Sequence, residues 1–357
     1  LYKNMKSMNQ LIITMMLCLF SIQAWAQNGK LFNTDNQLSS NLATQVFQDK
    51  SGFIWIATRN GLNTYDGYHI TVMKKEMSNF LGLNSNYINS IAQDHKEHIL
   101  LGTNNSLLEF TGSEFRKIPL LDSKGGELST YVKQVYPLKN KDVAVATSGY
   151  GIMLKKQDTQ ECHAMKGKVE KLKYIHKLLE DKRGRLWIIA EDGRLHRKET
   201  NGRVISYFSG TEGVSAQDIQ QDALGNIYLA SKNQGVYLLR AGSNVFTRIS
   251  NIGNLPIDNI YISRNNKLYI GSDGLGIYVY DPQTGFLQDN PLFCRLVNLA
   301  KSKVTSIIED NQGNIWVSML QKGVFMQSNT QNDFNYMGFR LGSRNVIGEN
   351  CVTSLCI

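Results

Sequence analysis

The stretch "DKSGFIWIATRNGLNTYDG", residues 49–67, combines tight turns with a run of β-forming residues. Asp49 and Gly52 stand at the first and last positions of a four-residue segment, as a type I turn favours. Aromatic and β-branched residues follow and predict a strand over 53–58, and Asp66-Gly67 predicts a hairpin turn. The glycines match neither G-x-G-x-x-G nor G-x-x-x-x-G-K-[ST], so they indicate architecture and not a phosphate-binding loop.

The turn and the aromatic residue after it recur along the chain as D-x-x-G-x-ø-W, in which ø is apolar. Copies begin at Asp181, Asp310 and Asp222, and weaker copies begin at Asp94 and Ser263. The least recognisable copy has alanine in the tryptophan position, at residue 144. The repeats are 41–47 residues long, with the tryptophan position at residues 55, 100, 144, 187, 228, 269 and 316. Repeats of this length, with four short strands each, are typical of propeller blades.

The sequence therefore predicts an all-β fold, a seven-bladed β-propeller of four-stranded antiparallel blades. We expect the propeller over residues 27–340. A truncated eighth repeat is expected over 341–357, where "CVTSLCI" copies the first strand of a blade. Two segments compete to complete the last blade, 30–34 ("KLFNT") and 333–339 ("DFNYMGF"), and the first is favoured.

Residues 1–26 have the features of a secretory signal peptide. Lys3 and Lys6 precede an apolar run over 11–22, and Ala24-Trp25-Ala26 follows as a cleavage site. A retained membrane anchor is the alternative, although the run is short for a bilayer span. Removing this segment lowers the formal charge from +9 to +7, because it holds two lysines and no acids. A basic exported domain could bind acidic ligands, whereas scattered surface charge is the simpler explanation, and no Lys/Arg run indicates nucleic-acid binding.

Residues 38–70 ("LSSNLATQVFQDKSGFIWIATRNGLNTYDGYHI") closely resemble the two-component regulator propeller repeat, and the resemblance extends over 38–329. The elements N-x-x-x-x-V, D-x-x-G-x-ø-W, small-Thr-x-x-Gly-ø and Tyr-Asp-Gly occur in this order within one unit. Blade 3 departs most from the pattern, with Ala144 in the tryptophan position. Members of this Bacteroidetes family are similar in having two propellers and a β-sandwich outside the cytoplasmic membrane. A transmembrane helix, a histidine kinase, a receiver domain and an AraC-type helix-turn-helix follow.

The resemblance implies that the chain is the first propeller of a periplasmic sensor in a hybrid two-component system. The parent protein would be a histidine kinase anchored in the inner membrane. The implied ligand is a glycan-derived oligosaccharide, acidic ones included, and the implied partner is a second copy, in a homodimer formed through the whole sensor region. For this segment the resemblance implies no catalysis, no cofactor and no nucleic-acid contact. Two other functions remain open, an exported polysaccharide lyase or glycoside hydrolase and a structural module for dimerisation and signal transmission.

The aromatic residues in the tryptophan position are interpreted as blade anchors that pack between neighbouring blades. They are Trp55, Trp187, Tyr228, Tyr269 and Trp316. Because these positions repeat with the period of the fold, packing explains them better than sugar binding does.

The loops between the second and third strands are the candidate ligand site, since they share a face with the connections between blades and surround the central channel. Their candidate ligand-binding residues are Arg59, Asn60, Asn104, Tyr150, Lys232, Asn233, Asp273 and Lys322. The same loops carry Asn105, Glu191, Asp192, Gln234 and Gln321. These residues could instead be ordinary turn formers, or the ligand could bind at a junction with other domains.

No catalytic residues are predicted. A glycosidase needs two positioned carboxylates, and nothing in the sequence pairs Glu191, Asp192 or Asp273 with a second acid. No G-x-S-x-G element for a nucleophilic serine occurs either.

No metal site is predicted. His95 and His98 share one turn beside Glu97 at a spacing that a metal could use, and they are interpreted as a solvated surface turn. The cysteines have no zinc-site spacing, and Cys162 and Cys294 are expected to be free or buried.

Overall fold

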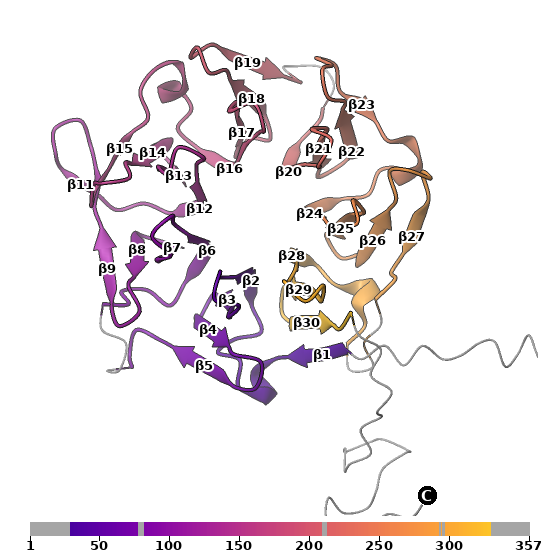
Figure 1. Cartoon of the computed structure of the whole chain (residues 1–357), viewed down its shortest axis with the longest axis horizontal. Helices are drawn as coiled ribbons and strands as arrows, with labels where there is room; N and C mark the ends of the chain where they lie inside the picture. The colour runs from indigo at the N-terminus through magenta and orange to yellow at the C-terminus, as the bar shows by residue number, and fades with distance from the viewer. Residues whose placement is uncertain (1–28, 78–81, 209–212, 293, 295–296, 330–357) are drawn as a thin grey trace, which may run out of the picture. The chain divides into compact units, whose positions relative to one another are not determined.

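Seven β-sheets follow one another around a ring in the computed structural model of the protein (Figure 1). The structure describes residues 29–77, 82–208, 213–292, 294 and 297–329. The expected signal peptide over 1–26, the segment 333–339 and the eighth repeat over 341–357 lie outside the described residues. Each sheet forms one blade, with its first strand at the centre of the ring, so the predicted seven-bladed β-propeller is confirmed.

The first three blades follow in chain order. Blade 1 contains β2 (Ala43–Gln48), β3 (Ile54–Thr58), β4 (Gly61–Tyr65) and β5 (Ile70–Met73). Blade 2 contains β6 (Ile88–Gln93), β7 (Ile99–Thr103), β8 (Leu107–Phe110) and β9 (Phe115–Ile118). Blade 3 contains β12 (Val132–Pro137), β13 (Val143–Thr147), β14 (Ile152–Lys155) and β15 (Cys162–Ala164). It also holds β10 (Leu120–Leu121) and β11 (Glu127–Leu128), a short hairpin whose β10 pairs parallel with β15. This blade therefore has six strands in place of the four predicted.

The remaining blades have four strands each. Blade 4 contains β16 (Ile175–Glu180), β17 (Leu186–Ala190), β18 (Leu195–Lys198) and β19 (Val204–Tyr207). Blade 5 contains β20 (Ala216–Gln221), β21 (Ile227–Ser231), β22 (Gly235–Leu239) and β23 (Thr247–Arg248). Blade 6 contains β24 (Ile257–Ile262), β25 (Leu268–Ser272), β26 (Ile277–Tyr280) and β27 (Leu287–Asp289). Blade 7 contains β28 (Val304–Glu309), β29 (Ile315–Met319), β30 (Gly323–Gln327) and, from the other end of the described chain, β1 (Gly29–Phe32).

Strand β1 closes the ring, as the preference for segment 30–34 predicted. It pairs antiparallel with β30 and completes blade 7 (Figure 1). Phe32 is buried at this junction, where its ring lies 5.3 Å from the ring of Trp316 and 4.9 Å from that of Tyr65. Since Tyr65 belongs to blade 1, the aromatic contact also joins the last blade to the first.

The residue in the tryptophan position of each blade packs against the next blade. Trp55, for example, shares an apolar cluster with Leu101 and Phe115 of blade 2. Trp187, Tyr228 and Trp316 are buried in the corresponding interfaces, and Tyr269 is partly buried against blade 7. Burying each large ring contributes about 2–3 kcal/mol. Because each ring lies between two blades, this stabilisation is distributed over the interfaces between blades and not concentrated in one core.

The aspartate of each clear repeat holds both the turn and the tryptophan. In blade 4, Asp181 Oδ1 accepts the backbone N–H groups of Arg183 and Arg185, and Oδ2 accepts the indole N–H of Trp187 at 2.9 Å. The corresponding indole bonds are 2.7 Å in blade 1 and 2.8 Å in blade 7. This double role explains why the aspartate and the tryptophan stand six residues apart in the repeat.

The wall of the channel is linked from blade to blade by polar side chains. Every innermost strand has a bulge around its second residue, and a bulge can redirect a side chain. The third residue then reaches the neighbouring blade: Gln45 accepts from the backbone N–H of Ile91 at 2.8 Å, and Gln134 accepts from that of Leu178 at 2.6 Å. Blade 4 uses an ion pair in this place, Lys177 with Asp218 at 3.0 Å.

Candidate functional site

The loops between second and third strands lie on the same face as the connections between blades, as expected. Their backbone N–H groups donate to the residue that precedes an innermost strand, for example Ser148 to Tyr131 O and Glu191 to Tyr174 O, both at 3.0 Å. We call this surface the connection face. It gathers residues from every blade around the mouth of the channel, which makes it the candidate binding surface.

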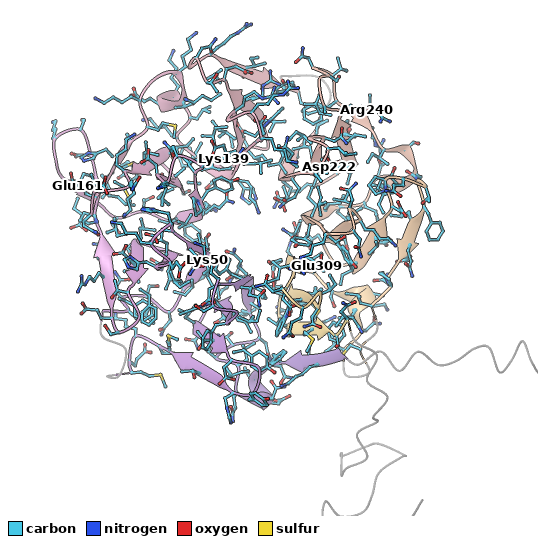
Figure 2. All side chains as sticks on the ribbon, viewed as in Figure 1. Lys50, Lys139, Glu161, Asp222, Arg240 and Glu309 are labelled. Atoms are coloured by element: carbon cyan, nitrogen blue, oxygen red, sulfur yellow. The ribbon has the colours of Figure 1, made fainter. Side chains whose placement is uncertain are left out.

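The opposite face uses its polar groups to join neighbouring blades. There the last residue of an innermost strand accepts a backbone N–H from the turn that follows the innermost strand of the neighbouring blade, as Glu180 does from Lys139 at 2.7 Å and Glu309 does from Arg264 at 2.8 Å. Lys139 and Glu309 are labelled in Figure 2, toward the inner side of the ring. Because these carboxylates already bond neighbouring blades to each other, the connection face is the better candidate for ligand binding.

A row of aromatic and charged side chains crosses the connection face from blade 1 to blade 4. It consists of Arg59, Tyr87, Tyr131, Lys133 and Glu191. The guanidinium of Arg59 lies 5.5 Å from the Tyr87 ring centre, and the Tyr87 and Tyr131 rings are 5.9 Å apart. The Lys133 ammonium lies 4.6 Å from the Tyr131 ring centre and 3.4 Å from Glu191. Burial and a hydrogen bond with Tyr87 raise the pKa of Tyr131 above its ordinary value, so its hydroxyl stays a donor at neutral pH.

A second charged group spans blades 6 and 7. Lys303 contacts the carboxylates of Asp258 and Asp273 at 2.8 and 2.9 Å. Burial raises the pKa of Asp258 even though the Lys303 ammonium opposes the shift. Burial would lower the pKa of Lys303, but its hydrogen bonds to both carboxylates raise it instead. Asp273 therefore has a second acid beside it, which the sequence did not indicate.

His176 lies on β16, the innermost strand of blade 4. Burial and, to a smaller extent, the Lys177 ammonium together lower its pKa to about 4. The imidazole is therefore neutral at physiological pH and can accept or donate a hydrogen bond.

The predicted ligand-binding residues fall into three groups. Arg59 and Asp273 belong to the two charged groups above, and Tyr150 and Lys232 are exposed. Asn60, Asn104, Asn233 and Lys322 make bonds within the chain. Lys322 Nζ, for instance, donates to two carbonyl oxygens and a hydroxyl of residues 298–302. The structure thus brings some of the candidates together and shows that others shape their own loops.

Sequence reasoning missed Tyr174, whose side chain is 59% exposed. It precedes β16, and it pairs with Ser148 in an isolated β-bridge. Gly149 and Gly151 donate to Lys173 O, both at 2.8 Å, so the loop that carries Tyr150 is fixed beside Tyr174. Tyr150 is itself 43% exposed. The available signal was an aromatic residue directly before an innermost strand, where the repeat has no fixed residue type.

Three segments of the chain match the model of the two component regulator propeller, over residues 37–60, 82–105 and 298–321. They cover the innermost two strands of blades 1, 2 and 7 with the loops around them. No curated protein sequence matches the chain. None of the short helices in the described part of the chain is long and apolar enough to cross a bilayer.

Several solved structures share the fold. The extracellular domain of BT3049, named as a hybrid two component system of B. thetaiotaomicron, superposes with a TM-score of 0.74 at 23% identity. The match covers 85% of this chain and 42% of that domain. The corresponding domain of BT4673 gives 0.70 at 14% identity, over 85% of this chain and 43% of that one. Virginiamycin B lyase from Staphylococcus aureus gives 0.65 at 12% identity, over 85% and 99%. At these identities the likeness shows the propeller fold alone, and the chain spans less than half of the two Bacteroides domains.

Proposed function

Because the chain carries repeats of the two component regulator propeller family, we propose that it is the ligand-sensing propeller of a hybrid two-component regulator. In this proposal the propeller lies in the periplasm and is non-catalytic. It works as part of a longer protein that is a homodimer anchored in the inner membrane. The repeat family supports the sensor role, and the ligand is inferred from the connection face.

We propose a glycan-derived oligosaccharide as the ligand. The observation that carries this choice is the pair of exposed tyrosines on the connection face, Tyr150 and Tyr174, whose backbone segments are hydrogen-bonded to each other. An aromatic ring offers an apolar face and, in tyrosine, a hydroxyl, which suits a sugar ring with its apolar faces and polar rim. Arg59, Lys133 and Lys232 add cations on the same face, and cations bind carboxylates and sulfates by charge-assisted hydrogen bonds. Acidic oligosaccharides are therefore the preferred class.

Calorimetric titration with a panel of neutral and acidic oligosaccharides tests this proposal. The test variant is Tyr150→Ala/Tyr174→Ala. The matched control is Tyr68→Ala/Phe286→Ala, which removes two exposed rings from hairpins on the opposite face. Two stacked rings worth about 0.5–1.5 kcal/mol each predict a loss of affinity of about 5- to 140-fold in the test variant only. Equal affinities in both variants would place the ligand away from the connection face.

One observation favours the alternative of an exported enzyme. Asp258 and Asp273 share the Lys303 ammonium, and Asp258 has a raised pKa, which is a property of general acids. Product analysis after incubation with the same oligosaccharides separates the two functions. Turnover by the wild type that Asp258→Asn abolishes would replace the sensor proposal, whereas binding without products supports it.

A further inference from the structure

The turn aspartate of blade 2 lacks the partner that its equivalents have. In blades 1, 4 and 7 the inner carboxylate oxygen accepts an indole N–H, and in blade 5 Asp222 Oδ2 accepts from Asn226 Nδ2 at 2.7 Å. In blade 2 the tryptophan position holds Leu100, which has no donor. Asp94 Oδ1 still accepts the backbone N–H groups of Lys96 and His98, at 2.8 and 2.9 Å. Asp94 Oδ2 is buried and makes no hydrogen bond.

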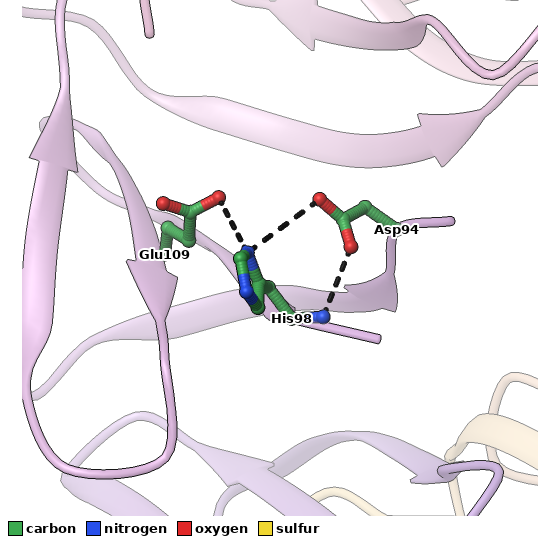
Figure 3. Close-up of side chains that lie close together, drawn as sticks. All are labelled: Asp94, His98 and Glu109. Atoms are coloured by element: carbon green, nitrogen blue, oxygen red, sulfur yellow. Dashed lines mark hydrogen bonds and ion pairs between the residues drawn. The ribbon is translucent and has the colours of Figure 1, made fainter. Parts of the chain in front are cut away.

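A second buried acid faces the same point. Glu109 lies on β8 directly across from Leu100, and its side chain is only 4% exposed. Its Oε1 atom is 3.1 Å from His98 Nδ1, which is also 3.9 Å from Asp94 Oδ2 (Figure 3). Figure 3 shows the imidazole between the two carboxylates. The three side chains come from the turn and from β8, which is why the spacing of His95, Glu97 and His98 did not reveal them. The side chain of Glu97 instead pairs with Lys50, at 3.4 Å.

One imidazolium cannot balance the charges of both carboxylates in this cluster. Within the described residues, His98 is the one basic side chain at salt-bridge distance from Asp94 or Glu109. Two carboxylates carry two negative charges, and a protonated imidazole supplies one positive charge. The remaining charge would be buried, which is strongly unfavourable. A divalent cation beside a neutral imidazole gives a net charge of zero.

We propose that Asp94, His98 and Glu109 form a binding site for a divalent transition metal of the Zn²⁺ class. Their ligand atoms all lie within 4.8 Å of one another. Zinc binds nitrogen and carboxylate oxygen at about 2.0–2.2 Å, so small side-chain rotations bring all three into a tetrahedral arrangement. The imidazole and the low ligand number disfavour Ca²⁺ and Mg²⁺, which take oxygen ligands and more of them. The His98 side chain is 33% exposed, which leaves an entry path and a fourth position for water.

The metal would replace the indole clamp of the other blades. It would tie the turn between β6 and β7 to β8, just as the hydrogen bond from Trp187 to Asp181 fixes the turn of blade 4. A ligand on β8 makes this link longer in sequence than the indole bond, because Asp94 and Glu109 are 15 residues apart. The site is thus a metal staple within blade 2.

Zinc titration of the metal-free, untagged chain by calorimetry tests the site. One Zn²⁺ per chain is expected in the wild type. Losing even an outer partner of a metal ligand weakens binding by about 10- to 100-fold, so His98→Ala and Glu109→Gln should each lose at least that much. His95→Ala is the matched control, with the same substitution three residues away in the same turn, and it should bind like the wild type.

Thermal unfolding supplies a second measurement that does not depend on the heat of binding. Zn²⁺ should raise the midpoint of the wild type, because a ligand that binds only the folded state stabilises it. The midpoint of Glu109→Gln, whose side chain has nearly the same size, should not respond to Zn²⁺. The proposal fails if the wild type binds no Zn²⁺, which would leave an imidazolium ion pair. It fails also if His98→Ala and Glu109→Gln bind like the wild type, or if His95→Ala loses as much as they do.

Discussion

Replacing Asp181 by alanine tests the double role of the turn aspartate most directly. Asp181 is fully buried and accepts four hydrogen bonds, from the backbone of Arg183 and Arg185, from Arg185 Nε at 2.6 Å and from Trp187 Nε1 at 2.9 Å. After substitution, water can reach the turn backbone, because Arg183 and its neighbours in the turn are exposed. It cannot reach the indole, because Trp187 is fully buried.

The expected cost follows from these groups. The orphaned indole N–H costs about 1–3 kcal/mol, and the lost charge-assisted bond from Arg185 costs about 1.5–3 kcal/mol. We therefore expect Asp181→Ala to lower the free energy of unfolding by about 3–5 kcal/mol. The matched control is Asp222→Ala in blade 5, whose inner oxygen is bonded to Asn226, a side chain that water can reach. The Asp222 carboxylate also hydrogen-bonds the buried hydroxyl of Tyr228, but it has no bond to a guanidinium. That variant should therefore lose less, about 1–3 kcal/mol.

Equilibrium unfolding in urea, followed by tryptophan fluorescence and by circular dichroism, measures both variants. Coincident curves from the two probes justify the two-state treatment. A Trp187→Phe variant, alone and combined with Asp181→Ala, then isolates the indole bond as a coupling energy of about 1–2 kcal/mol. Equal losses for Asp181→Ala and Asp222→Ala, or a coupling energy near zero, would refute the role assigned to the indole.

The same residue predicts a loss of stability in acid. Burial alone would raise the pKa of Asp181, but the hydrogen bonds from Trp187 and Arg185 outweigh it and hold the pKa below its ordinary value. A carboxyl group with a depressed pKa in the folded state contributes stability above its unfolded pKa of about 3.9. That contribution disappears as the pH falls through the pKa that Asp181 has in the folded state. The stability difference between wild type and Asp181→Ala should therefore narrow below about pH 4.

Three further predictions concern single residues. Burial lowers the pKa of His176 to about 4, so the unfolded chain binds a proton that the folded chain does not between this pH and its ordinary value. As the pH falls through that range, the free energy of unfolding of the wild type, measured in urea, should decrease by up to about 3 kcal/mol. That of His176→Gln should decrease much less. A Cβ atom on Gly323 would lie 2.1 Å from Phe32 O, whereas one on Gly52, also at positive φ, meets nothing within 4 Å. Gly323→Ala should therefore destabilise the closure strand by at least about 2 kcal/mol more than Gly52→Ala, with earlier cleavage in limited proteolysis. Burial raises the pKa of the Cys162 thiol to about 12, so iodoacetamide should modify this residue in urea only.

The repeat pattern carried enough information to predict the fold. Its period set the number of blades, and its aspartate and tryptophan marked one turn and one interface in each. The segment 30–34 resembled a strand that needed a partner, and β30 provides that partner. The hairpin of β10 and β11 could not be predicted, because it lies in a connection that occurs once and has only two residues in each strand. Such short strands have no periodicity to read.

The candidate site was predicted only in outline. The loop positions of Arg59 and Asp273 followed from the repeat, but their partners Tyr87 and Lys303 did not. Those partners stand at the ends of connections between blades, where no residue type recurs. Contacts on this face join residues of neighbouring blades, so they depend on how two different repeats meet. A repeat pattern contains only what the blades share, so it does not predict contacts between residues that occur in one blade each.

The most informative residue in this respect is Glu109, because neither the turn nor the core explains it. Asp94 still caps its turn without a tryptophan, whereas the positions equivalent to Glu109 in blades 3, 5, 6 and 7 are apolar, with Leu154, Leu238, Val279 and Met326. If the site binds no metal, Glu109→Leu should stabilise the protein, because it removes the buried carboxylate that the single imidazole leaves unbalanced. If the metal site is real, the order reverses when the ion is added. We expect Glu109→Leu to be more stable than the wild type in a chelator and less stable in saturating Zn²⁺, in parallel urea titrations. Curves that keep the same order in both conditions would show that Glu109 has no part in binding a metal.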